Sequence, residues 1–255
     1  MKSSRSFIPA SNPLASLGDT VLSAISLIQV DSMTNTSPRL YLITPLISDP
    51  AAFAGTLESA CATGGIAAVM LRLADADERT LINRIKVLAP IVQKHEVAVI
   101  ITTEGEIPVD LANIAARGGA DGVHIPFNTE AILNIVLQLK GERSLGIGNL
   151  RSRDDAMRAG ELGVDYVMFG EPRRDGSLPA RDMVLERAQW WAEIFETPCV
   201  VFSPDIDSIR EIMATGAEFI ALGDAIWTHD GGVAVAVDAA VKAIATDEAT
   251  QARHE

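Results

Sequence analysis

Short apolar runs alternate along the chain with longer stretches that repeat apolar residues at helical spacing. The helical spacing is clear in residues 77–95, where Leu81 and Ile85 begin one apolar face. Near-continuous apolar runs of this length are typical of parallel strands buried on both faces. The runs lie within residues 40–44, 65–71, 98–102, 119–125, 144–148, 163–169, 198–202 and 216–222. The pattern therefore predicts strands that alternate with helices.

One short phrase introduces every second strand. It begins with a glycine, at Gly65, Gly119, Gly163 and Gly216, and continues into an apolar run. A glycine just past a helix takes the left-handed conformation at little cost, so each phrase marks a helix-to-strand joint. The intervals of about 50 residues leave room for one further strand and helix in each gap. Repetition at such intervals indicates a fold built from similar units.

Eight alternating units from about Pro38 onward predict an α/β fold, a (βα)8 TIM barrel in a single domain. The alternative is an open doubly wound sheet. Eight units of similar size, and the absence of a Gly-x-Gly-x-x-Gly turn, count against that alternative. We expect three segments: a flexible N-terminal extension at 1–37, the barrel at 38–246 and a polar C-terminal tail at 247–255.

The N-terminal extension is rich in serine, asparagine, threonine and proline. Its apolar stretch at 21–30 resembles a signal peptide only weakly, because no small-residue cleavage pattern follows it. A second interpretation is that translation starts at Met33, from which residues 34–39 lead directly into the first strand. The sequence leaves the choice between Met1 and Met33 open.

Composition narrows the function classes. The chain has 255 residues, 48% of them hydrophobic, and a net charge of −13. Nucleic-acid binding needs a basic face, so we expect no nucleic-acid partner. No apolar run is long enough to span a bilayer, so we expect no membrane association and a cytoplasmic location. Cys61 and Cys199 lie in apolar surroundings, which favours buried free thiols over a disulfide framework or a metal site.

Polar side chains follow the predicted strands, at the ends where TIM barrels build their sites. Arg72 ends the second strand and His124 lies in the fourth, and both are candidates for catalysis. No residue is assigned to a metal. The candidate ligand-binding residues are Thr103, Asn149, Glu171, Arg173, Arg174, Ser203 and Asp224.

Each candidate also has a structural alternative. Arg72 could pair with Glu104 or Asp224 across the barrel mouth, and His124 could be a core residue. The arginines at 173–174 suit either a bidentate clamp for phosphate or carboxylate or a solvated loop.

Several phrases in the chain resemble one family. The segments 40–45, 71–72, 120–124 and 166–170 are similar to thiamine phosphate synthase, whose fold is shared by the thiazole tautomerases of thiamine metabolism. The resemblance extends from about Arg39 to Trp227. It implies coupling of a pyrimidine diphosphate to a thiazole phosphate, with release of pyrophosphate and a need for Mg²⁺.

The chain departs from the family at the strand ends. Arg72 matches the family's arginine, but Thr103 and Thr129 stand where the family has metal-binding aspartates. At the phosphate end the family's glycines and serine correspond to Ser203-Pro204 and Gly223-Asp224. Proline has no N–H to offer a phosphate, and an aspartate would repel it.

The main hypothesis is a thiamine phosphate synthase-like barrel with a divergent active site. It lacks the standard Mg²⁺-dependent transferase activity and binds a small polar ligand at the C-terminal barrel mouth. One alternative is an active, Mg²⁺-dependent thiamine phosphate synthase that recruits Glu104, Glu130 and the arginines at 173–174. The other is a non-catalytic partner or regulatory protein. The adjacent residues Trp190 and Trp191 cannot both face the core fully, so one is a candidate contact in a homo-oligomer.

Overall fold

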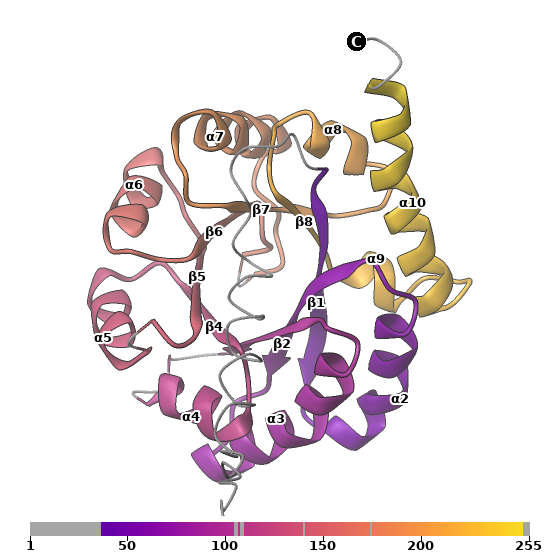
Figure 1. Cartoon of the computed structure of the whole chain (residues 1–255). Coiled ribbons are helices and arrows are strands. Elements are labelled where there is room, and N and C mark those ends of the chain that lie inside the picture. The colour runs from indigo at the N-terminus through magenta and orange to yellow at the C-terminus, as the bar shows by residue number, and fades with distance from the viewer. Residues whose placement is uncertain (1–36, 105–106, 108–109, 140, 174, 252–255) are drawn as a thin grey trace, which may run out of the picture.

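The computed structural model describes residues 37–104, 107, 110–139, 141–173 and 175–251. In this part of the chain eight parallel strands follow one another in chain order and close into a barrel. Helices surround the barrel (Figure 1). The predicted single-domain TIM barrel is confirmed. The strands are β1 (Arg39–Ile47), β2 (Ile66–Leu73), β3 (Ala98–Thr103), β4 (Gly122–Pro126), β5 (Ser144–Gly148), β6 (Tyr166–Phe169), β7 (Cys199–Ser203) and β8 (Phe219–Leu222).

The helices fill the intervals between strands. They are α2 (Pro50–Cys61), α3 (Glu78–Gln93), α4 (Leu111–Gly118), α5 (Thr129–Leu139), α6 (Arg153–Glu161), α7 (Arg181–Ile194), α8 (Ile209–Met213), α9 (Asp224–Trp227) and α10 (Val233–Gln251). The last helix thus continues into the segment 247–255 that was predicted as a tail. The stretch at 21–30 and the Met33 start lie outside the described residues. No helix among the described residues is long and apolar enough to cross a membrane.

Side-chain alternation along the strands builds two apolar layers. One set of strand residues, which includes Met70, Ile100 and Val200, forms an apolar cluster made up of strand residues and fills the barrel interior. The neighbouring residues, such as Leu71 and Ile101, join a larger cluster with the helices. A strand position therefore shows by its parity whether its side chain points into the barrel or toward the helices.

The glycine joints take the predicted conformation. Gly65, Gly119, Gly163 and Gly216 all have positive φ, between 76° and 88°. In three of the four phrases an acidic residue stands two positions after this glycine. The carboxylate of this residue accepts a hydrogen bond from a backbone N–H near the start of the preceding strand. The pairs are Asp121 with Val99 (2.8 Å), Asp165 with Leu145 (2.7 Å) and Glu218 with Cys199 (2.8 Å).

The adjacent tryptophans of α7 have different surroundings. Trp191 is fully buried and stacks on Phe195, with ring centroids 4.1 Å apart. Trp190 is half-buried, and the guanidinium of Arg153 lies 4.8 Å from its ring centroid. Trp191 is thus the one that faces the core, and Trp190 stays partly exposed.

Candidate ligand site at the barrel mouth

Arg72 stands at the C-terminal end of β2, and its position directs it inward. It follows the interior residue Met70 by two positions, and it pairs in register with Thr102 of β3. Its backbone N–H donates to the Thr44 hydroxyl at 3.0 Å, which ties the ends of β1 and β2 together. Thr44 is buried, so this bond is shielded from water.

The guanidinium of Arg72 is unpaired in the part of the chain that the structure describes. Across the described ranges, no hydrogen bond or ion pair joins it to another residue, and the alternative pairing with Glu104 or Asp224 is not formed. A half-buried arginine at a barrel mouth is well placed for an anionic group.

Thr103 and Ser203 lie on the other face of their strands. Thr103 follows the outward residue Ile101 by two positions and pairs in register with Leu73, which also belongs to the outer cluster. Ser203 is fully buried, and its hydroxyl donates to the Asp205 carbonyl at 2.7 Å. The residue that faces the interior beside Arg72 is Thr102, which sequence analysis did not select. Side chains alternate between the two faces of a strand, so Thr102 lies on the same face as Ile100. This alternation was the sequence signal that could have selected Thr102.

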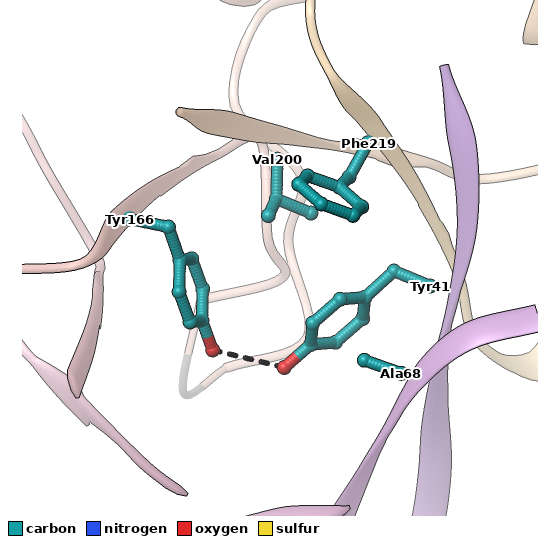
Figure 2. A pocket seen from close by; sticks show the side chains of 5 residues that line it. All are labelled: Tyr41, Ala68, Tyr166, Val200 and Phe219. Atoms are coloured by element: carbon teal, nitrogen blue, oxygen red, sulfur yellow. Dashed lines mark hydrogen bonds between the residues drawn. The ribbon is translucent and has the colours of Figure 1, made fainter. Parts of the chain in front are cut away.

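A buried hydrogen-bond chain connects the barrel interior to His124. The hydroxyls of Tyr41 and Tyr166 lie 2.9 Å apart, and Figure 2 shows the two rings pointing toward one another across a small cavity. The Tyr166 hydroxyl lies 3.1 Å from His124 Nδ1. Burial raises the pKa of both tyrosines far above the usual range, so both hydroxyls keep their protons.

Glu171 continues this chain at the mouth. Its Oε1 lies 3.4 Å from His124 Nε2, and its Oε1 and Oε2 accept the backbone N–H of Asn149 at 3.2 and 3.0 Å. Asn149 has a φ of 55°, a left-handed conformation that asparagine tolerates better than most residues. The structure therefore brings together His124, Asn149 and Glu171, three of the predicted residues.

Two glycines in β5 make room for this arrangement. A Cβ at Gly146 would lie 1.9 Å from the Tyr166 ring, and one at Gly148 would lie 1.8 Å from Glu171 Oε1. Any larger residue would displace the tyrosine or the glutamate. The Gly-x-Gly spacing in an apolar strand was the sequence signal for a close approach at this point.

Of the remaining candidates, Arg173 lies on an exposed loop. The backbone N–H of Arg173 donates to the Ser177 carbonyl at 2.9 Å, and its Nη1 lies 3.4 Å from the Ser177 hydroxyl. Arg174 lies outside the described residues. Asp224 is exposed and begins α9, the short helix after β8. Barrels that bind phosphate often place it at a short helix after the eighth strand, where here an aspartate stands.

The family expectation of Mg²⁺ can be tested on the residues present. Thr103 faces away from the mouth, and the Thr129 hydroxyl accepts from Arg158 Nη2 at 3.3 Å. Within the described ranges, no group of three or more histidine, cysteine, aspartate or glutamate side chains could hold a metal ion. Mg²⁺ is bound in proteins mainly through carboxylates and water. At these two positions the chain has threonine hydroxyls where the resemblance implies aspartates.

Comparison with known proteins places the chain in a family. The sequence profile described as "Thiamine monophosphate synthase" matches residues 40–226. The thiamine-phosphate synthase of Rhodospirillum centenum is 37% identical over 204 residues, which cover 79% of this chain and 95% of that protein. That of Hyphomonas neptunium is 32% identical, covering 79% and 91%. Among solved structures, the thiamine phosphate pyrophosphorylase of Pyrococcus furiosus superposes with a TM-score of 0.67 at 20% identity, covering 83% of this chain and 98% of that one. The chain belongs to the thiamine monophosphate synthase family.

Proposed function

We propose that this chain is a divergent member of its family. It binds a small polar ligand at the barrel mouth and lacks the Mg²⁺-dependent transfer that the family name implies. The observation that carries the proposal is the position of Glu171. Its carboxylate already accepts the Asn149 N–H at the mouth and faces His124. A carboxylate in this place disfavours the negatively charged diphosphate of a transferase substrate.

The residues that follow β7 and β8 also disfavour a bound phosphate. The loop after β7 begins with Pro204, which has no N–H to donate, and α9 begins with the carboxylate of Asp224. Two anions and a missing donor oppose a bound phosphate dianion at the mouth. The guanidinium of Arg72, which has no partner among the described residues, leaves one place for an anionic group of lower charge.

An active synthase is the second candidate, and the relatives favour it. Three proteins named thiamine-phosphate synthase are 37%, 32% and 31% identical to this chain over more than nine-tenths of their length. Arg72 also stays in place. In this candidate Glu104, Glu130 and the arginines at 173–174 would replace the family's charged residues.

The test is a direct assay. The purified protein is mixed with the pyrimidine diphosphate, the thiazole phosphate and Mg²⁺, and thiamine phosphate is measured beside the Rhodospirillum centenum relative as a positive control. We expect no product above the background of an enzyme-free sample. Product whose formation is abolished by Arg72→Ala would establish the active synthase instead.

A binding measurement separates the remaining class. A ligand at 100 times its Kd stabilises a protein by about 2.7 kcal/mol, which a thermal-shift assay detects. We expect a shift with at least one small carboxylate and loss of that shift in Arg72→Ala. A protein that neither forms product nor responds to any small molecule would fit the non-catalytic partner class.

A further inference from the structure

We propose that Glu171 is the acceptor for a protonated nitrogen of the ligand, and that His124 is the positioning residue that orients it. The inference rests on the proposed ligand site and adds the chemical class of the ligand. It follows from the direction of the hydrogen-bond chain that runs from Tyr41 through Tyr166 and His124 to Glu171.

The direction of the chain is set at its buried end. The Tyr41 hydroxyl is fully buried, and Tyr166 is the hydrogen-bond partner that the structure gives it. If Tyr166 donated to Tyr41, the proton of Tyr41 would have no acceptor. An unsatisfied buried donor is costly, so Tyr41 donates to Tyr166. Tyr166 then donates its own proton to His124 Nδ1.

The same argument sets the state of His124. Its Nδ1 accepts from Tyr166, so the ring proton resides on Nε2 and points at Glu171 Oε1, 3.4 Å away. A proton on Nδ1 would reverse both tyrosine bonds and leave the Tyr41 proton unpaired. His124 Nε2 is therefore a donor, and the group it faces acts as an acceptor.

Glu171 receives donors from two directions. His124 Nε2 faces one oxygen, and the Asn149 N–H approaches both. Its side chain remains 18% exposed. A carboxylate held in place by these donors has acceptor capacity left, which suits an ammonium or another charged N–H group.

Arg72 and Glu171 lie on opposite sides of the mouth. Arg72 ends β2 and Glu171 follows β6, and in a closed barrel of eight strands in chain order these are four positions apart. A ligand across the mouth meets a guanidinium on one side and a carboxylate on the other. The geometry suits a small zwitterion, with its anionic group at Arg72 and its protonated nitrogen at Glu171.

The first experiment tests the chain without a ligand. Ring ¹⁵N NMR of the labelled protein, with His124 assigned from the spectrum of His124→Gln, reports which ring nitrogen carries the proton. We expect the proton on Nε2 and none on Nδ1 in the native protein, and a mixture of both tautomers in Tyr166→Phe. A proton on Nδ1 in the native protein would overturn the inferred direction of the chain.

The second experiment tests the ligand class. ω-Amino acids of increasing chain length and the matched carboxylic acids without the amino group are titrated by calorimetry. We expect at least one ω-amino acid to bind about tenfold more tightly than its matched acid, the effect of one charge-assisted hydrogen bond. Glu171→Gln should remove this preference. The control Glu161→Gln, at the exposed end of α6, should keep it.

The outcomes separate the two proposals. Equal binding of amino acid and matched acid by the native protein, or a preference that survives in Glu171→Gln, would contradict the role of Glu171 alone. Failure of every compound to bind would contradict the ligand site at Arg72, and the inference with it.

Discussion

Tyr166 and His124 stack inside the barrel, with ring planes 25° apart, centroids 5.7 Å apart and the tyrosine hydroxyl 3.1 Å from Nδ1. The contact joins β6 to β4, although β5 lies between them in the barrel. It is possible because Gly146 of β5 has no side chain to separate them. The pair links the apolar interior of the barrel to the polar mouth.

Removal of the Tyr166 hydroxyl should lower the free energy of unfolding more than removal of the Tyr41 hydroxyl. Tyr166→Phe removes the partner of both Tyr41 and His124, whereas Tyr41→Phe leaves Tyr166 bound to His124. We expect Tyr166→Phe to lower the free energy of unfolding by about 1–3 kcal/mol, and Tyr41→Phe to lower it less. Urea denaturation measures both, and a larger loss in Tyr41→Phe would contradict the chain.

The two glycines of β5 should respond differently to an added methyl group. At Gly146 the new Cβ meets a buried tyrosine ring, whereas at Gly148 it meets the end of a flexible glutamate and, at 2.6 Å, Nε2 of the buried His124. Overpacking a core costs about 1–3 kcal/mol or more, so Gly146→Ala should destabilise strongly. Gly148→Ala should cost less, because Glu171 can move outward, although the His124 ring must also shift.

Gly55 of α2 provides the matched control for these variants. A Cβ at Gly55 meets nothing within 4 Å, and alanine favours a helix by about 1 kcal/mol relative to glycine. Gly55→Ala should leave stability unchanged or raise it. If thermal denaturation showed equal losses for Gly146→Ala and Gly55→Ala, the close approach at β5 would be disproved.

The carboxylate of Glu218, at the joint before β8, should make stability depend on pH. Partial burial raises the pKa of Glu218 above its usual range, although the hydrogen bond from the Cys199 N–H opposes the shift. A group whose pKa is higher in the folded than in the unfolded state contributes stability below the unfolded value, about 4.3 for glutamate, and that contribution is lost as pH rises through the folded value. Relative to Glu218→Gln, the native protein should therefore become more stable as pH falls from neutral to about pH 4. Urea titrations at both pH values measure the difference in free energy of unfolding between the native protein and the variant. A difference that does not change with pH would contradict the prediction.

Both cysteines should resist modification in the folded protein. Cys61 and Cys199 are free and buried, with exposed fractions of 1% and 0%. Burial raises the pKa of Cys61 to about 12 and that of Cys199 well above its usual value, so little reactive thiolate forms. Mass spectrometry after iodoacetamide treatment should find no modification without urea and two modified cysteines with it. Rapid native labelling of either residue would show that the site opens to solvent.

The sequence by itself determined the architecture of the barrel. Apolar periodicity distinguishes strands from helices, and a glycine with positive φ ends a helix wherever the chain runs, so the joints at Gly119 and Gly163 are local features. The strand-end rule also selected Arg72, His124 and Glu171 as candidates, because their position along a strand or just beyond it follows from the same periodicity.

Only the tertiary structure decided which of these residues act together. Glu171 and His124 are 47 residues apart in the chain, and they meet because closure of the barrel brings the ends of β4, β5 and β6 to one rim. Whether Thr102 or Thr103 faces the barrel interior depends on the alternation of side chains along β3. A shift of one residue in the predicted strand exchanges the two faces. The free guanidinium of Arg72 likewise depends on distances across the mouth. Such contacts between distant residues arise from packing, and local periodicity carries no record of them.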